Sequence, residues 1–273
     1  MSRSTGSWKV DAATYEDLPS TLVVEELQDL PQTFALARKR KDLAVLEGFH
    51  AIKHALRFGA HVRQVVAVDP DSLENLAEEL APDLHGVFRR IAQQVPPDVF
   101  KRLSKSVPHT EVMAIAYRSE VNVTALLQDQ SPRPIIFLDD PRNLGNLGAV
   151  IRVAAAADVV AVLTRGVNDP WDPTAIRGSA GLHYAVPVAR VPQLPSGSRP
   201  VVAVDPEGSA LRPGVLPDRA ILAFGTERHG LTDDLLARAD MRVRIPMRPG
   251  VSSLNLATSV AVLLYSSTWV DSR

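Results

Sequence analysis

The feature that most constrains the fold is a series of short apolar runs in the second half of the chain. Each run is continuously apolar, and helical stretches separate one run from the next. Continuous apolar strands that alternate with helices are typical of a parallel sheet that is covered on both faces. The sequence therefore predicts an α/β domain. We expect strands at 135–138, 159–163, 201–204, 221–224 and 241–245, and helices at 147–157, from 233 onward and at 254–268.

Loops rich in glycine, asparagine, serine and arginine follow three of these strands, at 139–148, 225–230 and 246–253. Ligands of parallel sheets bind beyond the carboxyl ends of the strands, so we expect a binding site where these loops meet. The first loop places glycines before a helix, as phosphate-binding loops do. It has neither the G-x-G-x-x-G spacing of a dinucleotide site nor a Walker lysine, which disfavours both of those readings.

The first half of the chain predicts a different organisation. Residues 1–40 form an N-terminal extension that ends in a helix at 21–40, and we expect Pro31 to break this helix. Residues 41–120 predict a small α/β unit, with strands at 43–46, 62–68 and 112–117 and helices at 50–58, 73–80 and 97–103. The segment 121–134 contains Gln-Asp-Gln-Ser-Pro-Arg-Pro and is predicted to be a linker, which leaves 135–273 as the second domain.

Composition excludes several classes of protein. The chain has no cysteine, which excludes disulfides, thiolate metal sites and a cysteine nucleophile and fits a reducing cytoplasm. No apolar run reaches the ~20 residues that span a bilayer, and the polar N-terminus lacks the apolar core of a secretory signal. The net charge of −1 provides no overall basic field that would attract nucleic acid. We therefore expect a cytoplasmic protein that does not enter a membrane.

Three weaker patterns remain open or are rejected. His50 and His54 stand four residues apart near Glu47, but a third ligand and the His-Glu-x-x-His pattern are missing, so we predict no metal site. The basic run at 38–41 is either simply solvated or contacts RNA phosphates. Trp171 is a core residue, a dimer contact or a platform on which a base stacks.

Three segments in the second half carry a resemblance to a known family. Asn146-x-Gly148-x-x-x-Arg152 follows an apolar strand and an Asp-Pro pair, and it resembles the first motif of the SpoU-like (TrmH-type) branch of the SPOUT RNA methyltransferases. Residues 224–231 (Phe-Gly-Thr-Glu-Arg-His-Gly-Leu) resemble the second motif of this family, and residues 245–255 (Ile-Pro-Met-Arg-Pro-Gly-Val-Ser-Ser-Leu-Asn) resemble the third.

The resemblance extends beyond these motifs. Residues 177–181 (Arg-Gly-Ser-Ala-Gly) match the intervening segment of the family, and the likeness as a whole covers 133–268. Residues 41–118 resemble more loosely the small RNA-binding domain of the family, which is akin to certain ribosomal proteins. The family implies an α/β methyltransferase domain with a C-terminal trefoil knot, an exception to the rule against knotted chains. It also implies that the protein works as a homodimer.

The same resemblance implies that the protein uses S-adenosylmethionine as its methyl donor. The loops at 225–231 and 245–255 would hold the donor, largely through backbone groups. The donor-binding residues that the resemblance implies are Phe224, Gly225, Thr226, Gly230, Ile245, Met247, Ser252 and Leu254.

The family also points to Arg152 as the catalytic centre. A guanidinium hardly deprotonates in a protein, so we expect Arg152 to fix a phosphate and stabilise the developing alkoxide rather than to act as a base. Asn146, Ser253 and Asn255 would orient the ribose and its phosphate by hydrogen bonds. Glu227 would hold Arg152 or shape the pocket.

These expectations predict an RNA methyltransferase that modifies the ribose 2′-hydroxyl of ribosomal RNA. We expect ribosomal RNA rather than transfer RNA as the substrate, because the first domain resembles ribosomal proteins. A transfer-RNA 2′-O-methyltransferase is one alternative. A non-catalytic RNA-binding or ribosome-associated factor is another, although the presence of all five motif residues argues against it. A nicotinamide-dependent dehydrogenase is disfavoured because the dinucleotide fingerprint is missing.

Overall fold

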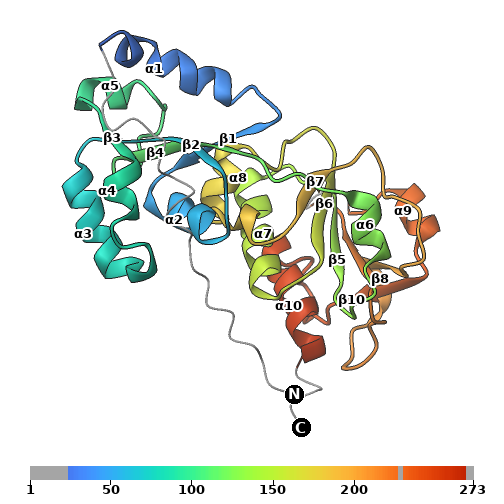
Figure 1. Cartoon of the computed structure of the whole chain (residues 1–273). Coiled ribbons are helices and arrows are strands. Elements are labelled where there is room, and N and C mark those ends of the chain that lie inside the picture. The colour runs from blue at the N-terminus through green and yellow to red at the C-terminus, as the bar shows by residue number, and fades with distance from the viewer. Residues whose placement is uncertain (1–23, 227–229, 269–273) are drawn as a thin grey trace. The chain divides into compact units, whose positions relative to one another are not determined.

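The computed structural model describes residues 24–226 and 230–268. The chain divides into two compact units, residues 1–118 and residues 119–273 (Figure 1). The first unit contains a four-stranded sheet, and the second contains a six-stranded sheet. In the described part of the chain, no helix is both long enough and apolar enough to cross a membrane.

The sheet of the first unit has the strand order β1-β4-β2-β3. Strand β4 runs antiparallel to β1 and to β2, whereas β2 and β3 run parallel. The three strands predicted in this region are confirmed, and β3, with only three residues, was not predicted. The strands are β1 (Leu43–Glu47), β2 (Val62–Ala67), β3 (Ala92–Gln94) and β4 (Val112–Tyr117). The helices are α1 (Val24–Ala37), α2 (Phe49–Arg57), α3 (Pro70–Leu80), η2 (Pro82–Leu84), α4 (Val87–Ile91) and α5 (Pro97–Lys101).

Helix α1 belongs to the core of the first unit. Leu30, Phe34 and Ala37 are buried on its inner face, where they join a cluster that includes Phe100. The expected break at Pro31 is wrong, because the helix continues through this residue. A proline removes one backbone hydrogen bond, and the burial of three side chains within two turns stabilises the helix against that loss. Residues of the predicted N-terminal extension therefore contribute to the core of this unit.

The second unit is built on an entirely parallel sheet with the order β10-β8-β9-β5-β6-β7. All five predicted strands are confirmed, and most of their apolar side chains are buried in the core. The unpredicted strand, β7, has three residues and lies at the edge. The strands are β5 (Ile135–Asp139), β6 (Ala161–Arg165), β7 (Val188–Arg190), β8 (Val201–Ala210), β9 (Ile221–Phe224) and β10 (Met241–Arg244). The helices are α6 (Val123–Gln128), α7 (Leu144–Ala156), α8 (Pro173–Gly178), η3 (Leu182–Tyr184), α9 (Asp233–Arg238) and α10 (Leu256–Thr268).

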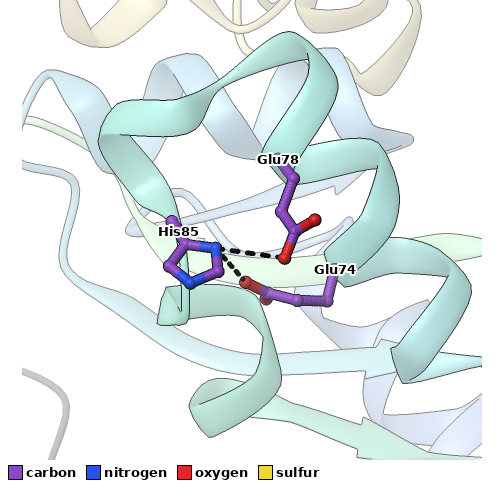
Figure 2. A group of neighbouring side chains, drawn as sticks. All are labelled: Glu74, Glu78 and His85. Atoms are coloured by element: carbon purple, nitrogen blue, oxygen red, sulfur yellow. Dashed lines mark ion pairs between the residues drawn. The ribbon is translucent and has the colours of Figure 1, made fainter.

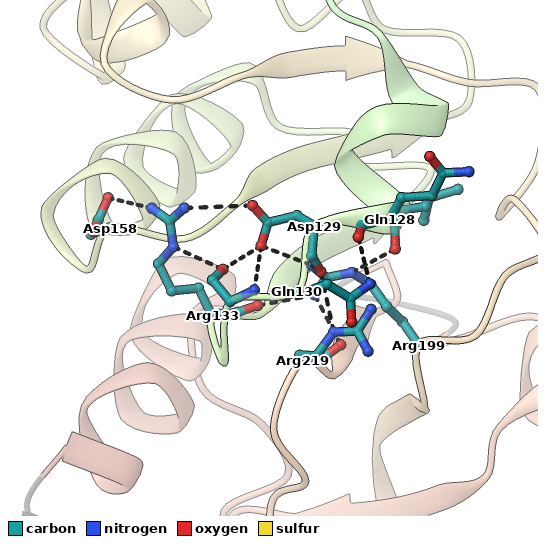
Figure 3. Close-up of polar contacts among 9 residues, drawn as sticks. Gln128, Asp129, Gln130, Arg133, Asp158, Arg199 and Arg219 are labelled. Atoms are coloured by element: carbon teal, nitrogen blue, oxygen red, sulfur yellow. Dashed lines mark hydrogen bonds and ion pairs between the residues drawn. The ribbon is translucent and has the colours of Figure 1, made fainter.

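The segment 121–134, predicted to be a linker, is an ordered part of the second unit. It contains helix α6, whose Leu127 is buried in the core of this unit. The guanidinium of Arg199, which has 0% exposed side-chain surface, donates hydrogen bonds to the carbonyl oxygens of Leu127, Asp129 and Arg133 (Figure 3). It also donates to the carbonyl of Arg219, just before β9. These bonds hold the segment against the amino-terminal ends of the strands. The composition of the segment, from which a linker was predicted, does not indicate these contacts.

Candidate active site

A cavity of about 690 Å³ lies at the carboxyl ends of β9 and β10, beside residues 204–206 of β8. The eight residues that the family resemblance assigns to the methyl donor all line this cavity, and so does Ser253. The other described residues of the lining are Val204, Asp205, Pro206, Arg244, Arg248, Pro249, Gly250, Val251, Leu256 and Ser259. The cavity therefore joins loops that are distant in the sequence, at the edge of the sheet where parallel folds bind ligands.

The second motif forms a tight loop whose backbone comes close to itself. Thr226 and Gly230 exchange two backbone hydrogen bonds, with N···O distances of 3.0 and 3.1 Å. A Cβ atom on Gly225 would lie only 1.9 Å from the carbonyl carbon of Gly230. Glycine is therefore required at 225, because any side chain would overlap the returning backbone. Residues 227–229, including the predicted site residue Glu227, lie outside the described residues.

A buried carboxylate anchors the end of this loop. Asp139, at the carboxyl end of β5, is 2% exposed and is ion-paired with Arg165 at the end of β6. Its other oxygen accepts hydrogen bonds from the backbone N–H (3.2 Å) and the hydroxyl (3.1 Å) of Thr232. Arg165 also donates to the Thr232 hydroxyl, over 2.8 Å. The family motifs do not include this anchor. The signal in the sequence that could have indicated it is the acidic residue at the end of an apolar strand.

Two of the predicted catalytic residues, Asn146 and Asn255, are in direct contact. Asn146 lies in the first turn of α7, and Asn255 precedes α10, which packs against α7 (Figure 1). The side-chain amide of Asn255 donates to the side-chain oxygen of Asn146 over 3.0 Å. The Asn255 oxygen meanwhile accepts from the backbone N–H of Ala257 (2.9 Å), so this residue also caps α10. The first and third motifs thus meet through this hydrogen bond.

Arg152 lies further along α7 and is exposed. It is not among the residues that line the cavity. Within the described ranges 24–226 and 230–268, no hydrogen bond or ion pair holds its guanidinium. An exposed guanidinium presents five N–H donors to solvent and to any anion that approaches this face of the helix.

The glycine of the first motif brings α7 and α8 together. A Cβ atom on Gly148 would lie 2.3 Å from the carbonyl oxygen of Ala175 and 2.8 Å from the Cα of Gly178. The two helices therefore touch backbone to backbone at this point. This contact explains why glycine residues occur in both the first motif and the 177–181 segment.

One group in the described residues has the spacing of metal ligands, and it lies in the first unit. Glu74, Glu78 and His85 place one ligand atom each within 4.8 Å of one another (Figure 2). The buried Glu74 carboxylate accepts hydrogen bonds from the backbone N–H groups of Gly86 and Arg89 at the start of α4. Glu74 therefore caps a helix, and Glu78 and His85 are exposed. We assign this group a structural role in joining α3 to α4.

Comparison with known proteins places these features in a family. The model of the SpoU rRNA methylase family matches residues 133–265. An uncharacterized tRNA/rRNA methyltransferase of Synechocystis is 30% identical and covers 90% of each chain. A 23S rRNA guanosine 2′-O-methyltransferase of Bacillus subtilis is 26% identical and covers 84% of this chain and 89% of its own.

Solved structures support the same fold. The SpoU methyltransferase AviRb of Streptomyces viridochromogenes, solved in complex with the cofactor AdoMet, superposes with a TM-score of 0.71 at 23% identity, covering 90% of this chain and 97% of its own. The family match and the Synechocystis relative together cover both units of the chain. The chain therefore belongs to the SpoU rRNA methylase family and is an RNA methyltransferase.

Proposed function

We propose that this protein transfers a methyl group from S-adenosylmethionine to the 2′-hydroxyl of a ribose in ribosomal RNA. The observation that carries the proposal is the single cavity into which the loops of the second and third motifs converge, next to the Asn146–Asn255 contact. The ribose 2′-hydroxyl is supported by the Bacillus subtilis relative, whose name specifies a 2′-O-methylation of 23S rRNA.

The residues of the cavity fit the proposed donor. A volume of about 690 Å³ falls within the range of small-molecule sites, which is roughly 300–1,000 Å³. Phe224 and Leu256 are buried apolar side chains that provide a wall for a purine, and the loop backbone at Gly225 also lines the cavity. When bound, S-adenosylmethionine supplies a methyl group on a positively charged sulfur that a nucleophile can attack.

The proposed roles of the polar residues follow from their positions. Arg152 binds a phosphate next to the target ribose and stabilises the negative charge that develops on the 2′-oxygen. The Asn146–Asn255 pair orients the ribose, and Ser253 at the cavity hydrogen-bonds to the ribose or its phosphate. Glu227 completes this set by holding Arg152 or by shaping the pocket. Correct orientation of the hydroxyl accounts for much of the acceleration that such a site achieves.

We further propose that the second unit ends in a trefoil knot and mediates homodimer formation. The route of the chain supports the knot: after β10, at one edge of the sheet, residues 245–255 pass residues 204–206 of β8 and the end of β9 before α10 packs against α7. The exposed Tyr265 on α10 supports a second copy docking on this helix. The first unit would select the RNA, and the protein would act in the cytoplasm.

The proposal is tested by incubating the protein with labelled S-adenosylmethionine and, separately, with ribosomal and transfer RNA. We expect label in ribosomal RNA, since two relatives, from Bacillus subtilis and Streptomyces laurentii, are named as 23S rRNA 2′-O-methyltransferases. Labelling of transfer RNA alone would favour the alternative substrate that the name of the Synechocystis relative also allows. Binding of the RNA without any methylation would favour a non-catalytic factor.

Arg152→Ala tests the role of the arginine in the same assay. We expect at least a 100-fold fall in the rate of transfer with unchanged affinity for the donor, because the guanidinium acts on the RNA. Arg212→Ala is the matched control, since Arg212 is an exposed arginine of the same unit outside the cavity. Undiminished methylation by Arg152→Ala would contradict the proposed role.

A further inference from the structure

One carboxylate lines the cavity among the residues that the structure describes, and the family motifs do not include it. Asp205 follows Val204, whose β-ladder partner on β9 is Phe224, so Asp205 lies directly beyond the apolar wall of the cavity. The other charged residues of the described lining are Arg244 and Arg248. A single acidic group in a small-molecule cavity calls for a ligand group that donates hydrogen bonds or carries positive charge.

Asp205 is held in a bulge of β8. Arg242 and Val243 are consecutive on β10, but their partners on β8 are Ala203 and Ser209, so residues 204–208 loop out of this ladder. Gly208 closes the bulge, because a Cβ atom there would lie 2.5 Å from the backbone nitrogen of Val243. Bulges of this kind redirect side chains next to binding sites. Here the bulge turns Val204 and Asp205 toward the cavity.

The carboxylate of Asp205 has only part of its hydrogen-bonding capacity in use. Its Oδ1 accepts from the backbone N–H of Glu207 over 2.9 Å. Among the described residues no other group donates to this carboxylate, and the residue is half-buried. An ionised carboxylate has about four acceptor positions, so a half-buried one gains from a ligand that supplies donors.

We propose that Asp205 is a donor-binding residue whose carboxylate accepts hydrogen bonds from the ribose hydroxyls of S-adenosylmethionine. This inference rests on the proposed function. Val204, the ladder partner of Phe224, extends the apolar wall that Phe224 and Leu256 provide for the purine, and Asp205 follows it directly. The ribose is the part of the donor attached directly to the purine. The methionine portion extends away from the purine through the sulfur. Asp205 therefore reaches the ribose rather than the ammonium group or the sulfonium.

The test measures binding of three compounds by calorimetry to the wild type and to Asp205→Asn. The compounds are S-adenosylmethionine, S-adenosylhomocysteine, which lacks the positive sulfur, and 5′-methylthioadenosine, which lacks the amino-acid portion. We expect Asp205→Asn to weaken all three by a similar factor of about ten, because each compound has the same ribose hydroxyls. Glu207→Gln is the matched control, since it removes the same charge from the same bulge at a residue that does not line the cavity.

The 2′-deoxy analogue of 5′-methylthioadenosine provides a second, independent readout. Loss of the hydroxyl should weaken binding to the wild type severalfold and change binding to Asp205→Asn little. A loss confined to S-adenosylmethionine would overturn the proposal in favour of the sulfonium, and a loss that spares only 5′-methylthioadenosine would overturn it in favour of the ammonium group. Unchanged affinities in a folded Asp205→Asn would also overturn it. A wild type that binds none of the compounds would contradict the proposed methyl donor itself.

Discussion

The side-chain amide of Asn255 performs two separable tasks. Its oxygen accepts from the N–H of Ala257 and caps α10, while its nitrogen donates to Asn146 on α7. The first contact stabilises a helix, and the second fixes the orientation of a residue next to the proposed ribose site. A substitution that keeps the oxygen and removes the nitrogen can therefore separate stability from activity.

Asn255→Asp should lower the rate of methyl transfer at least tenfold, because the carboxylate still caps α10 but no longer donates to Asn146. Donor affinity and melting temperature should stay close to those of the wild type. The measurement is single-turnover methyl transfer alongside thermal unfolding. Asn255→Ala, which loses both contacts, should lower the rate similarly and also lower the melting temperature. Wild-type transfer by a folded Asn255→Asp would show that the amide pair is not needed.

At the scale of helices and strands, the stability of the second unit depends on a close contact between two helices and on the buried guanidinium of Arg199. Helices α7 and α8 meet at Gly148, where the backbones leave no room for a Cβ atom. At the amino-terminal ends of the strands, Arg199 donates hydrogen bonds to carbonyl oxygens of the segment before β5. Burial lowers the pKa of Arg199 below its usual range, and the nearby Arg219 lowers it further. The carbonyl partners compensate for the loss of solvation.

Gly148→Ala should destabilise the second unit by about 2 kcal/mol or more, since a methyl group would meet the carbonyl oxygen of Ala175. Chemical unfolding followed by far-ultraviolet circular dichroism measures the effect. Gly197→Ala is the control, because the nearest atom to its Cβ would be an ordinary 3.9 Å away. Equal unfolding midpoints for the two variants would show that α7 and α8 separate freely.

Arg199→Met should destabilise the second unit by roughly 3 kcal/mol, because the apolar side chain leaves buried carbonyl oxygens without donors. The free energy of unfolding in urea is the quantity to measure. The exposed Arg212 of the same unit supplies the control substitution, Arg212→Met, for which we expect a change within about 0.5 kcal/mol. If both variants unfold alike, the segment 121–134 is not fastened by Arg199.

The parts of the fold that could be predicted from the sequence are those that depend on patterns of neighbouring residues. The strands of the second unit are continuous apolar runs, so their positions follow from burial on both faces. The short strands β3 and β7 carry too few residues for such a pattern, and the burial of Leu30 and Phe34 overrides the local effect of Pro31. Burial of these side chains depends on partners that the local sequence does not show.

The polar anchors could not be predicted because their partners are far apart in the chain. Asp139 accepts a hydrogen bond from Thr232, which is 93 residues away in the sequence, and Arg199 donates to the carbonyl of Leu127, which is 72 residues away. The eight cavity residues came from the family resemblance, since composition and periodicity had indicated only ligand-binding loops. Asp205 belongs to no motif, and its position at the cavity depends on the bulge in β8, which the sequence pattern does not predict.

At the scale of the whole molecule, the chain combines a unit with its own small sheet and a unit that contains the cavity. The net charge of −1 provides little long-range attraction for RNA, so we expect binding to depend on local groups, such as the phosphate contact proposed for Arg152. Every described residue that lines the cavity belongs to the second unit. Donor binding is therefore expected not to require the first unit.

The most direct test of the proposed reaction is the position of the transferred methyl group. Ribosomal RNA is incubated with the protein and labelled S-adenosylmethionine, then digested to nucleosides that are separated and identified by mass. We predict that the label appears in a 2′-O-methylnucleoside and that Arg152→Ala lowers its amount at least 100-fold while still binding the donor. Label on a nucleobase, or no label despite bound donor and RNA, would show that the protein is not a ribose 2′-O-methyltransferase.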